Sequence, residues 1–276
     1  TVTASTLSTP TIPAVGSKGY DSVKIIWSAV PGATSYEISY ASSASGNYYK
    51  AGTATTTSFI KNELTTGKTY YFKVRAVATS DSGTIYGSYS PYKAVTPIPA
   101  TPVAKAASLS YTSIKVSWAA VPGATAYKIY RGTSATGVFS YRLATASLSY
   151  TNTGLTTGKT YYYKVIAYRT VNGVQIVSKT TVVSARPVPV APTCSVSTKT
   201  ATKAGISWTG VTGATAYQVL RSETASGTYS LITTVNSSAR SYINTGLVTG
   251  KTYYYKVRAY HMEGSTKVYG YRSLAK

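Results

Sequence analysis

The stretch Leu155-Thr-Thr-Gly-Lys-Thr-Tyr-Tyr-Tyr-Lys-Val-Ile-Ala167 decides the fold, because the chain contains three closely similar copies of it. The other two copies run from Leu64 to Ala76 and from Leu247 to Ala259. Their glycines lie 91 and 92 residues apart, which indicates one structural unit repeated three times. In each copy a Gly-Lys-Thr turn precedes residues that alternate with a period of two, the pattern of a half-buried β-strand.

The spacing of the copies divides the chain into three segments of about 90 residues, each long enough for a small core of its own. We expect three domains, at residues 1–97, 98–187 and 188–276. Alternating prolines in 96–102 and 186–192 restrict the backbone to extended conformations, so we expect short, stiff linkers and units placed in a row. The 28 Tyr and the many Gly, Ser and Thr are typical of an all-β protein.

Other landmarks recur in the same order in every unit. One tryptophan per unit lies on an apolar strand, and we expect Trp27, Trp118 and Trp208 to be core anchors. A turn follows each tryptophan, as in Val121-Pro-Gly-Ala-Thr125, where glycine takes the positive φ of a type II turn. The next strand carries a tyrosine two residues before an aliphatic residue.

Together, these features resemble the fibronectin type III module, three times and over nearly the whole chain. The resemblance implies an all-β fold of three consecutive seven-stranded immunoglobulin-like sandwiches. It also implies that the Leu and first Tyr of the repeated stretch form the tyrosine corner of that family, in which the hydroxyl bonds a nearby backbone group. The residues in these places are Leu64, Tyr70, Leu155, Tyr161, Leu247 and Tyr253. The Lys- and Tyr-rich sequence of the repeated stretch resembles modules in secreted and surface proteins of Gram-positive bacteria.

The charge is strongly unbalanced, with 28 Lys and Arg against six Asp and Glu, a formal net charge of +22. Residues 98–187 contain no carboxylate side chain at all. Such a field favours contact with an anionic partner such as nucleic acid, an acidic polysaccharide, a wall polymer or lipid head groups. The alternative is a basic surface that serves only solubility.

Residues that carry chemistry are scarce. The carboxylates are scattered, and the single histidine, His261, is expected to be a solvated loop residue just past a strand. Cys194 is the only cysteine and has no partner for an intramolecular disulfide. We therefore expect no catalytic residues, no metal site and no cofactor. No apolar run reaches the roughly 18 residues that a membrane span needs.

Aromatic and cationic residues alternate on the outward side of the repeated strand and of the strand beside it. Aromatic rings stack on sugars or bases, and Lys and Arg pair with anions, so this surface is a candidate binding face. Cross-strand Tyr and Lys pairs that merely stabilise an open sheet are the alternative. The candidate residues are Tyr71, Lys73 and Arg75 in the first unit, Lys128, Tyr130, Tyr162 and Lys164 in the second, and Tyr254, Lys256 and Arg258 in the third.

Two functions fit these observations. The first is a non-catalytic, monomeric spacer that presents other domains of a larger extracellular protein, either secreted or attached to the cell surface. The second is an adhesion module in which the basic faces bind an anionic polysaccharide or a cell-wall polymer. Nucleic acid is the weaker partner, because no recognition motif accompanies the charge and the aromatic residues.

Overall fold

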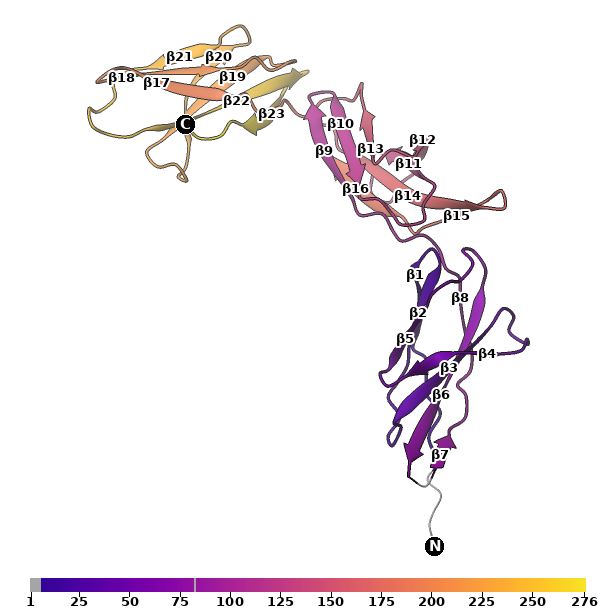
Figure 1. The fold of residues 1–276 in the computed structure, drawn as a ribbon. Helices are drawn as coiled ribbons and strands as arrows, with labels where there is room; N and C mark the ends of the chain where they lie inside the picture. Colours follow the sequence, from indigo (N-terminus) through magenta and orange to yellow (C-terminus); the bar gives the residue numbers. More distant parts are fainter. Residues whose placement is uncertain (1–5, 82) are drawn as a thin grey trace.

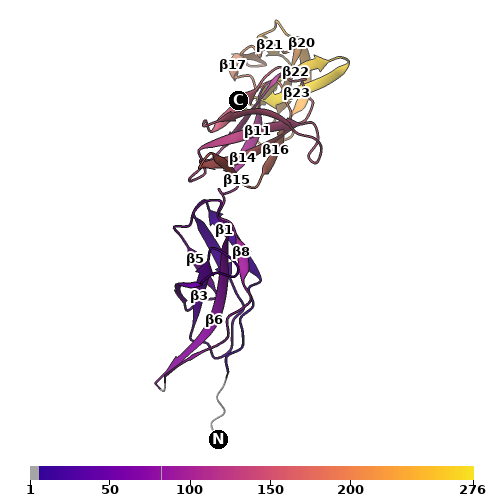
Figure 2. The same cartoon turned by 90° about the vertical axis from the view of Figure 1, so that its right-hand side faces the viewer.

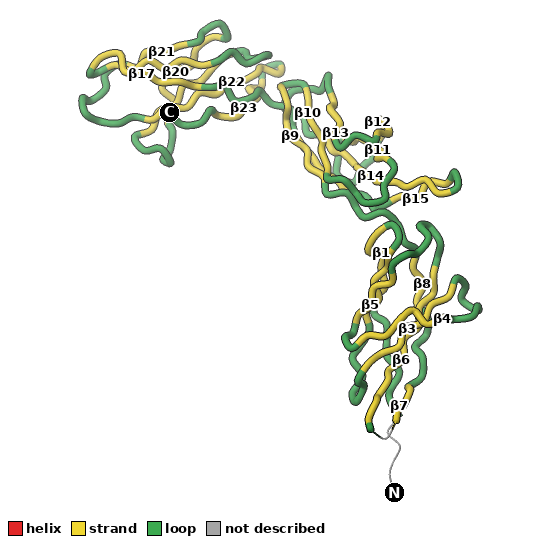
Figure 3. Tube along the Cα trace, in the orientation of Figure 1, coloured by secondary structure: helices red, strands yellow, loops and turns green. Residues whose placement is uncertain are grey.

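The computed structural model describes residues 6–81 and 83–276, so the first five residues of the expected first domain, and residue 82, lie outside it. Within the described residues the regular elements are antiparallel strands in six sheets, which pair into three sandwiches (Figures 1 and 3). The all-β prediction is therefore confirmed. No helix long and apolar enough to cross a membrane occurs in this part of the chain.

The first sandwich packs a three-stranded sheet against a five-stranded one. The smaller sheet has the order β1 (Ala14–Gly19), β2 (Ser22–Ile26), β5 (Ser58–Lys61). The larger sheet has the order β4 (Tyr49–Ala54), β3 (Ser35–Ala41), β6 (Tyr70–Ser80), β7 (Gly83–Tyr86), and β8 (Lys93–Val95) also pairs with β6. The strand that follows β6 is thus split into two short pieces along one edge of β6.

The second sandwich repeats this topology. Its smaller sheet has the order β13 (Ser149–Asn152), β10 (Ser113–Trp118), β9 (Ala104–Ser110). Its larger sheet has the order β12 (Ser140–Thr145), β11 (Ala126–Gly132), β14 (Tyr161–Val171), β15 (Val174–Val177), and β16 (Thr181–Ala185) also pairs with β14.

The third sandwich has the same strand order with one unbroken last strand. Its smaller sheet is β17 (Cys194–Thr200), β18 (Lys203–Trp208), β21 (Ser241–Asn244). Its larger sheet is β20 (Ser230–Asn236), β19 (Ala216–Ser222), β22 (Tyr254–Glu263), β23 (Thr266–Arg272). The three sandwiches share the topology that the resemblance to fibronectin type III modules implies.

Three separate cores account for this division. In β14 the side chains of Tyr163, Val165 and Ala167 are fully buried, while Tyr162 and Lys164 stay partly exposed, as the period of two predicts. Each core contains one tryptophan, and all three are buried with exposed fractions of 2 to 5%. Each core cluster draws only on residues of its own sandwich.

The tyrosine corner is present in all three sandwiches but is less buried in the third. The backbone N–H of Thr156 donates to the Tyr161 hydroxyl at 3.1 Å, and Leu155 and Tyr161 are only 3% and 6% exposed. Tyr70 accepts a similar bond from Thr65 at 3.0 Å. In the third sandwich the bond to the Tyr253 hydroxyl lengthens to 3.3 Å, and Leu247 and Tyr253 are half-buried.

A second tyrosine contact closes the turn that follows each tryptophan. The hydroxyl of Tyr127 accepts a hydrogen bond from the backbone N–H of Val121 at 2.9 Å. The same bond joins Val30 to Tyr36 at 2.9 Å and Val211 to Tyr217 at 2.7 Å. Each sandwich thus fixes its turn without a disulfide.

The sandwiches follow one another end to end, and the row bends between the second and the third (Figures 1 and 2). At each step two turns of one sandwich meet the next sandwich. The turn between its first two strands meets the post-tryptophan turn, and the turn before its long strand meets the hairpin that follows the next long strand. We call these contacts the 1–2 junction and the 2–3 junction.

Candidate functional site

The candidate binding face lies on the outer side of the larger sheet in each sandwich. In the second, Tyr130 of β11 is paired with Lys164 of β14, and Lys128 and Tyr162 lie on the same face. Tyr71, Lys73 and Arg75 come from β6, and Tyr254, Lys256 and Arg258 from β22. All of these side chains are half-buried, so they lie against neighbours as well as against solvent.

Each lysine at the centre of this face rests on an aromatic ring of its own sandwich. The Nζ atom of Lys73 lies 4.0 Å from the ring centroid of Tyr48. Lys164 lies 4.1 Å from the Phe139 ring, and Lys256 lies 4.3 Å from the Tyr229 ring. These cation–π contacts belong to the sheet itself and orient the lysines across it.

The three ring partners were missed by the sequence reasoning, although a signal exists. Each one stands two residues after a turn glycine, Gly46, Gly137 or Gly227. This identical spacing places the ring immediately before the edge strand, where it lies against the lysine of the long strand.

In the first sandwich a carboxylate neutralises part of the face. Nε of Arg75 donates to Oε1 of Glu37 at 2.9 Å, and the Arg75 NH2 atom lies 2.7 Å from the same oxygen. Burial by itself raises the pKa of Glu37, but the hydrogen bond from Tyr89 and the charge of Arg75 outweigh it and hold the pKa below its usual value.

The other two sandwiches place different groups at this position. In the third, the Gln218 amide oxygen accepts a hydrogen bond from Nε of Arg258 at 2.9 Å. In the second, Lys128 stands opposite Ile166, with no carboxylate anywhere in residues 98–187. The middle face is therefore cationic without internal compensation.

At the 1–2 junction, Tyr20 from the turn between β1 and β2 packs on Gly123 of the second sandwich. Gly123 has a φ of +71°, and a Cβ atom there would overlap the Tyr20 ring. The guanidinium carbon of Arg169 lies 4.9 Å from the Tyr20 ring centroid, and its NH1 atom donates to the Gly123 carbonyl at 3.0 Å. Beside them Gly67 contacts Ile176 of the next hairpin.

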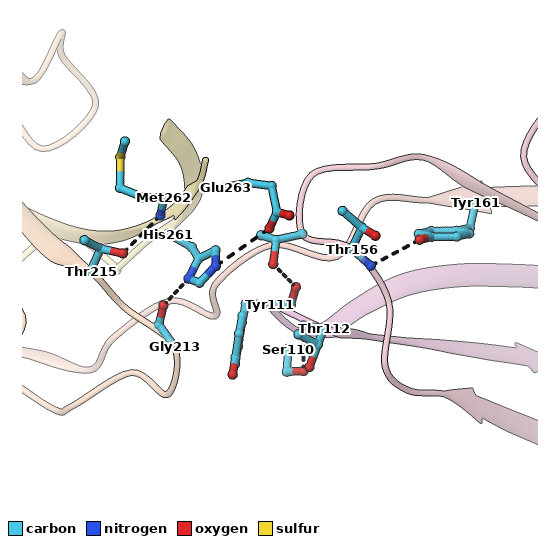
Figure 4. A network of polar contacts seen from close by, with 11 residues as sticks. Ser110, Tyr111, Thr112, Thr156, Tyr161, Gly213, Thr215, His261, Met262 and Glu263 are labelled. Atoms are coloured by element: carbon cyan, nitrogen blue, oxygen red, sulfur yellow. Dashed lines mark hydrogen bonds and ion pairs between the residues drawn. The ribbon is translucent and has the colours of Figure 1, made fainter. Parts of the chain in front are cut away.

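The 2–3 junction is built from the equivalent positions (Figure 4). Tyr111 packs on Gly213. Gly158 contacts Val268. His261 takes the place of Arg169: its ring centroid lies 5.0 Å from that of Tyr111, and its Nδ1 atom lies 2.6 Å from the Gly213 carbonyl. The expectation of a solvated loop residue was wrong, because β22 extends through residue 263 and carries His261 into the junction.

The linkers are held to the preceding sandwich by hydrogen bonds. The Ser17 hydroxyl both donates to the Ile98 carbonyl and accepts from the Ile98 N–H, each at 2.9 Å. Ser108 makes the same pair of bonds with Val188, at 3.0 and 2.8 Å. These bonds restrain the linkers in addition to the prolines.

The corresponding end of the third sandwich is open. Ala201 stands where the first two sandwiches have Tyr20 and Tyr111, and a Cβ at Gly250 would meet no described atom within 4 Å. A groove of about 410 Å³ lies there, bordered by residues that include Leu247, Gly250 and Tyr253. The missing cover explains why the third tyrosine corner is only half-buried.

Comparing alanine substitutions at Gly158 and Gly250 distinguishes the effect of the junction contact from the effect of local backbone strain. Gly158 and Gly250 have φ values of +79° and +80°, so alanine at either position is expected to cost the local sandwich about 1–2 kcal/mol. Only at Gly158 does the new Cβ collide with a neighbour, 2.8 Å from Cγ2 of Val268. We expect Gly158→Ala, and not Gly250→Ala, to widen the angular distribution of the 2–3 junction in small-angle X-ray scattering. Equal scattering curves would contradict this role.

The described residues contain no group of three or more His, Cys, Asp or Glu side chains that could hold a metal ion. His261 and Glu263 form only a pair, with 3.8 Å between Nε2 and Oε2. Burial raises the pKa of the Cys194 thiol, which leaves it in the neutral form.

No known family profile matches this sequence. The chain is 31% identical over 237 residues to Exoglucanase B of Cellulomonas fimi, an alignment that covers 76% of this chain and 20% of the relative. Among solved structures it is similar to the chicken CNTN1 FN1–FN3 domains, with 17% identity, a TM-score of 0.31, and 98% and 97% of the two chains covered. A structure described as FN3tt mut aligns at 25% identity with a TM-score of 0.28, over 32% of this chain and 96% of its own.

Proposed function

We propose that this chain, a tandem of three sandwiches with the fibronectin type III fold, is a non-catalytic spacer that holds neighbouring domains at a set separation and direction. The observation that carries this proposal is the repetition of the junction. Two tyrosines at equivalent turns pack on two equivalent glycines, and each contact is closed by a side chain from the following long strand. Contacts this similar favour a fixed orientation over free rotation.

We place the spacer in a larger extracellular protein, secreted or attached to a cell surface, with module boundaries near residues 97 and 187. The support is the similarity to a bacterial exoglucanase, of whose length this chain spans about a fifth. The partners of a spacer are the other domains of its own protein, and the modules themselves would act as a monomer.

The test measures a distance that spans both junctions of the intact chain. Spin labels on cysteines introduced at Lys18 and Ser237 should give one narrow distance distribution in pulsed dipolar spectroscopy. Tyr20→Gly with Tyr111→Gly should broaden that distribution strongly, because both ring contacts are lost. A distribution that is already broad in the unaltered junctions would overturn the proposal.

A second function is favoured by one observation, the uncompensated cationic face of the middle sandwich. Lys128, Lys164 and the exposed ring of Tyr141 lie on this sheet, and no carboxylate of residues 98–187 competes for the cations. Such a face would bind an anionic polysaccharide or a wall polymer through charge pairs and ring stacking.

For this second function, Tyr162→Ala with Lys164→Ala is expected to weaken binding of the intact chain to an anionic polysaccharide about tenfold, from one stacking contact and one charge lost. Titration calorimetry with heparin and with teichoic acid at low and physiological salt measures the effect. The matched control is Tyr71→Ala with Lys73→Ala, where Glu37 already offsets the cations, and it should change binding much less. Equal losses in both variants would assign the binding to net charge alone.

A further inference from the structure

On the outer face of the first sandwich, Arg75 lies in a cluster that contains its own counter-ion. Its guanidinium group is bonded to the carboxylate of Glu37. Its guanidinium carbon also lies 4.2 Å from the ring centroid of Tyr86 and 4.7 Å from that of Tyr89. The Tyr89 hydroxyl donates a hydrogen bond to the same carboxylate. One positive and one negative charge therefore cancel within this cluster.

The third sandwich builds the same frame around Arg258, but without the acid. Gln218 is paired with Arg258 across the two strands in the register that joins Glu37 to its arginine. The amide oxygen of Gln218 accepts a hydrogen bond from Nε of Arg258 at 2.9 Å, and the guanidinium carbon lies 4.0 Å from the Tyr269 ring centroid. The arginine is thus held in place by an amide and a ring, neither of which neutralises it.

A second arginine, Arg272, takes the position that Tyr89 has in the first sandwich. Each of the two residues comes immediately before the serine whose hydroxyl accepts a hydrogen bond from a buried valine of the long strand. Arg272 is paired directly across from Arg258, so both side chains belong to one face of the sheet. Burial and the charge of Arg272 both lower the pKa of Arg258. Like charges directly opposite each other cost stability unless an anion joins them.

The carboxylates of the third sandwich do not supply that anion. Residues 188–276 contain only two acidic side chains, Glu223 and Glu263. Glu223 lies 2.6 Å from the ammonium group of a lysine, and Glu263 lies beside the histidine at the end of β22. Within residues 6–81 and 83–276, no carboxylate forms a salt bridge with either arginine. The counter-ion of the pair has to come from a ligand.

We propose that Arg258 and Arg272 form a binding site for a phosphate or sulfate group of an anionic polysaccharide. A tetrahedral oxyanion has enough oxygens to accept from two guanidinium groups at once, whereas a single arginine satisfies both oxygens of a carboxylate. In the part of the chain that the structure describes, Arg258 is hydrogen-bonded only through Nε, which leaves its other N–H groups for the anion. Lys256, two residues earlier on the same strand face, extends the cationic surface along a longer ligand.

The polysaccharide as carrier rests on the second function proposed above, but the arginine site itself does not, because all of its residues belong to the third sandwich. Inorganic phosphate therefore tests the site alone. In the intact chain at constant ionic strength, the Nε–H signal of Arg258 in heteronuclear NMR should shift and saturate as phosphate is added. A signal that shifts without saturation would overturn the site.

Gln218→Glu recreates the acid–arginine pair that the first sandwich already contains, and it should weaken phosphate binding about tenfold. The matched control is Gln175→Glu at an exposed position of the second sandwich, which changes the net charge equally and should leave phosphate binding unchanged. Equal losses in the two variants would assign the binding to net charge and overturn the site.

Arg272→Tyr restores the residue of the first sandwich and should weaken phosphate binding about three- to tenfold, because one of the two guanidinium groups is lost. Without phosphate it should slow hydrogen exchange of the β22 amides, since the repulsion between the arginines is gone. A variant that binds phosphate as tightly as the original chain would overturn the two-arginine site.

Three small anions then identify the group. Methyl phosphate and methyl sulfate represent a phosphorylated and a sulfated polysaccharide, and the one that binds more tightly indicates which ester the site takes. Acetate represents a uronic acid and should bind least tightly, because it has only two oxygens. Acetate binding as tight as that of both esters would overturn the assignment to a tetrahedral anion.

Discussion

Replacing Tyr161 with alanine is expected to lower the free energy of unfolding of the second sandwich by about 3–5 kcal/mol, the usual cost of removing a buried aromatic side chain. The ring is 6% exposed and packs in the core with Leu155. Its hydroxyl also satisfies the N–H of Thr156, which the substitution leaves without this partner. Hydrogen exchange of the β14 amides in the full chain measures this free energy module by module.

Two control variants test whether the burial of Tyr161 sets this cost. Tyr162→Ala, one residue along, removes a half-buried ring from the outer face and should cost less than half as much. Tyr253→Ala in the third sandwich should also cost about half as much, because that corner is half-buried and its bond is longer. If Tyr253→Ala were as damaging as Tyr161→Ala, the covering module would contribute nothing to the corner.

Much of the fold was predictable because it depends on local periodicity. The alternation in Leu155 to Ala167 gives the burial of β14 residue by residue, and the positive φ values of Gly32, Gly123 and Gly213 follow from their turns. The resemblance to fibronectin type III modules then supplied the strand order, which spacing alone does not contain.

The junctions were not predictable, since they depend on side chains brought together from different repeats. Tyr20 and Tyr111 are two among 28 tyrosines, and nothing local distinguishes them from strand residues. The sequence does hold one signal in hindsight, the alignment of Arg169 with His261, but its meaning requires the contact with the preceding module. His261 was misplaced for the same reason: the length of β22 is set by pairing with β23.

The candidate face was predictable as a surface but not in its internal contacts. The repeat gives its lysines and tyrosines the correct side of the sheet, whereas the rings of Phe139 and Tyr229 stand just before an edge strand and are marked only by their spacing from a turn glycine. The pairing of Glu37 with Arg75 also depends on cross-strand register.

A buried polar pair in the second core gives the next largest expected effect. Nδ2 of Asn152 donates to the Tyr163 hydroxyl at 3.0 Å, with both side chains buried. Burial raises the pKa of Tyr163, so the hydroxyl stays neutral at physiological pH. The third sandwich keeps the pair as Asn244 and Tyr255, 2.9 Å apart.

The first sandwich supplies a natural comparison. It has Phe72 in place of the tyrosine and Lys61 in place of the asparagine, so both partners differ together. Phe72 is fully buried in the same core position. The fold therefore accepts an apolar ring there when its polar partner is also gone.

We expect Asn152→Leu alone to lower the free energy of unfolding of the second sandwich by about 1–3 kcal/mol, because the Tyr163 hydroxyl is left buried and unpaired. Tyr163→Phe alone should cost a similar amount, since it leaves the buried Asn152 amide without its hydrogen-bond partner. The double variant should lie within about 1 kcal/mol of the original chain, because neither substitution then leaves the other buried polar group unpaired. Hydrogen exchange of the β14 amides measures the free energy of unfolding in the original chain, the two single variants and the double variant. Costs that simply add would show that the two groups do not depend on each other, and that the paired change in the first sandwich has another cause.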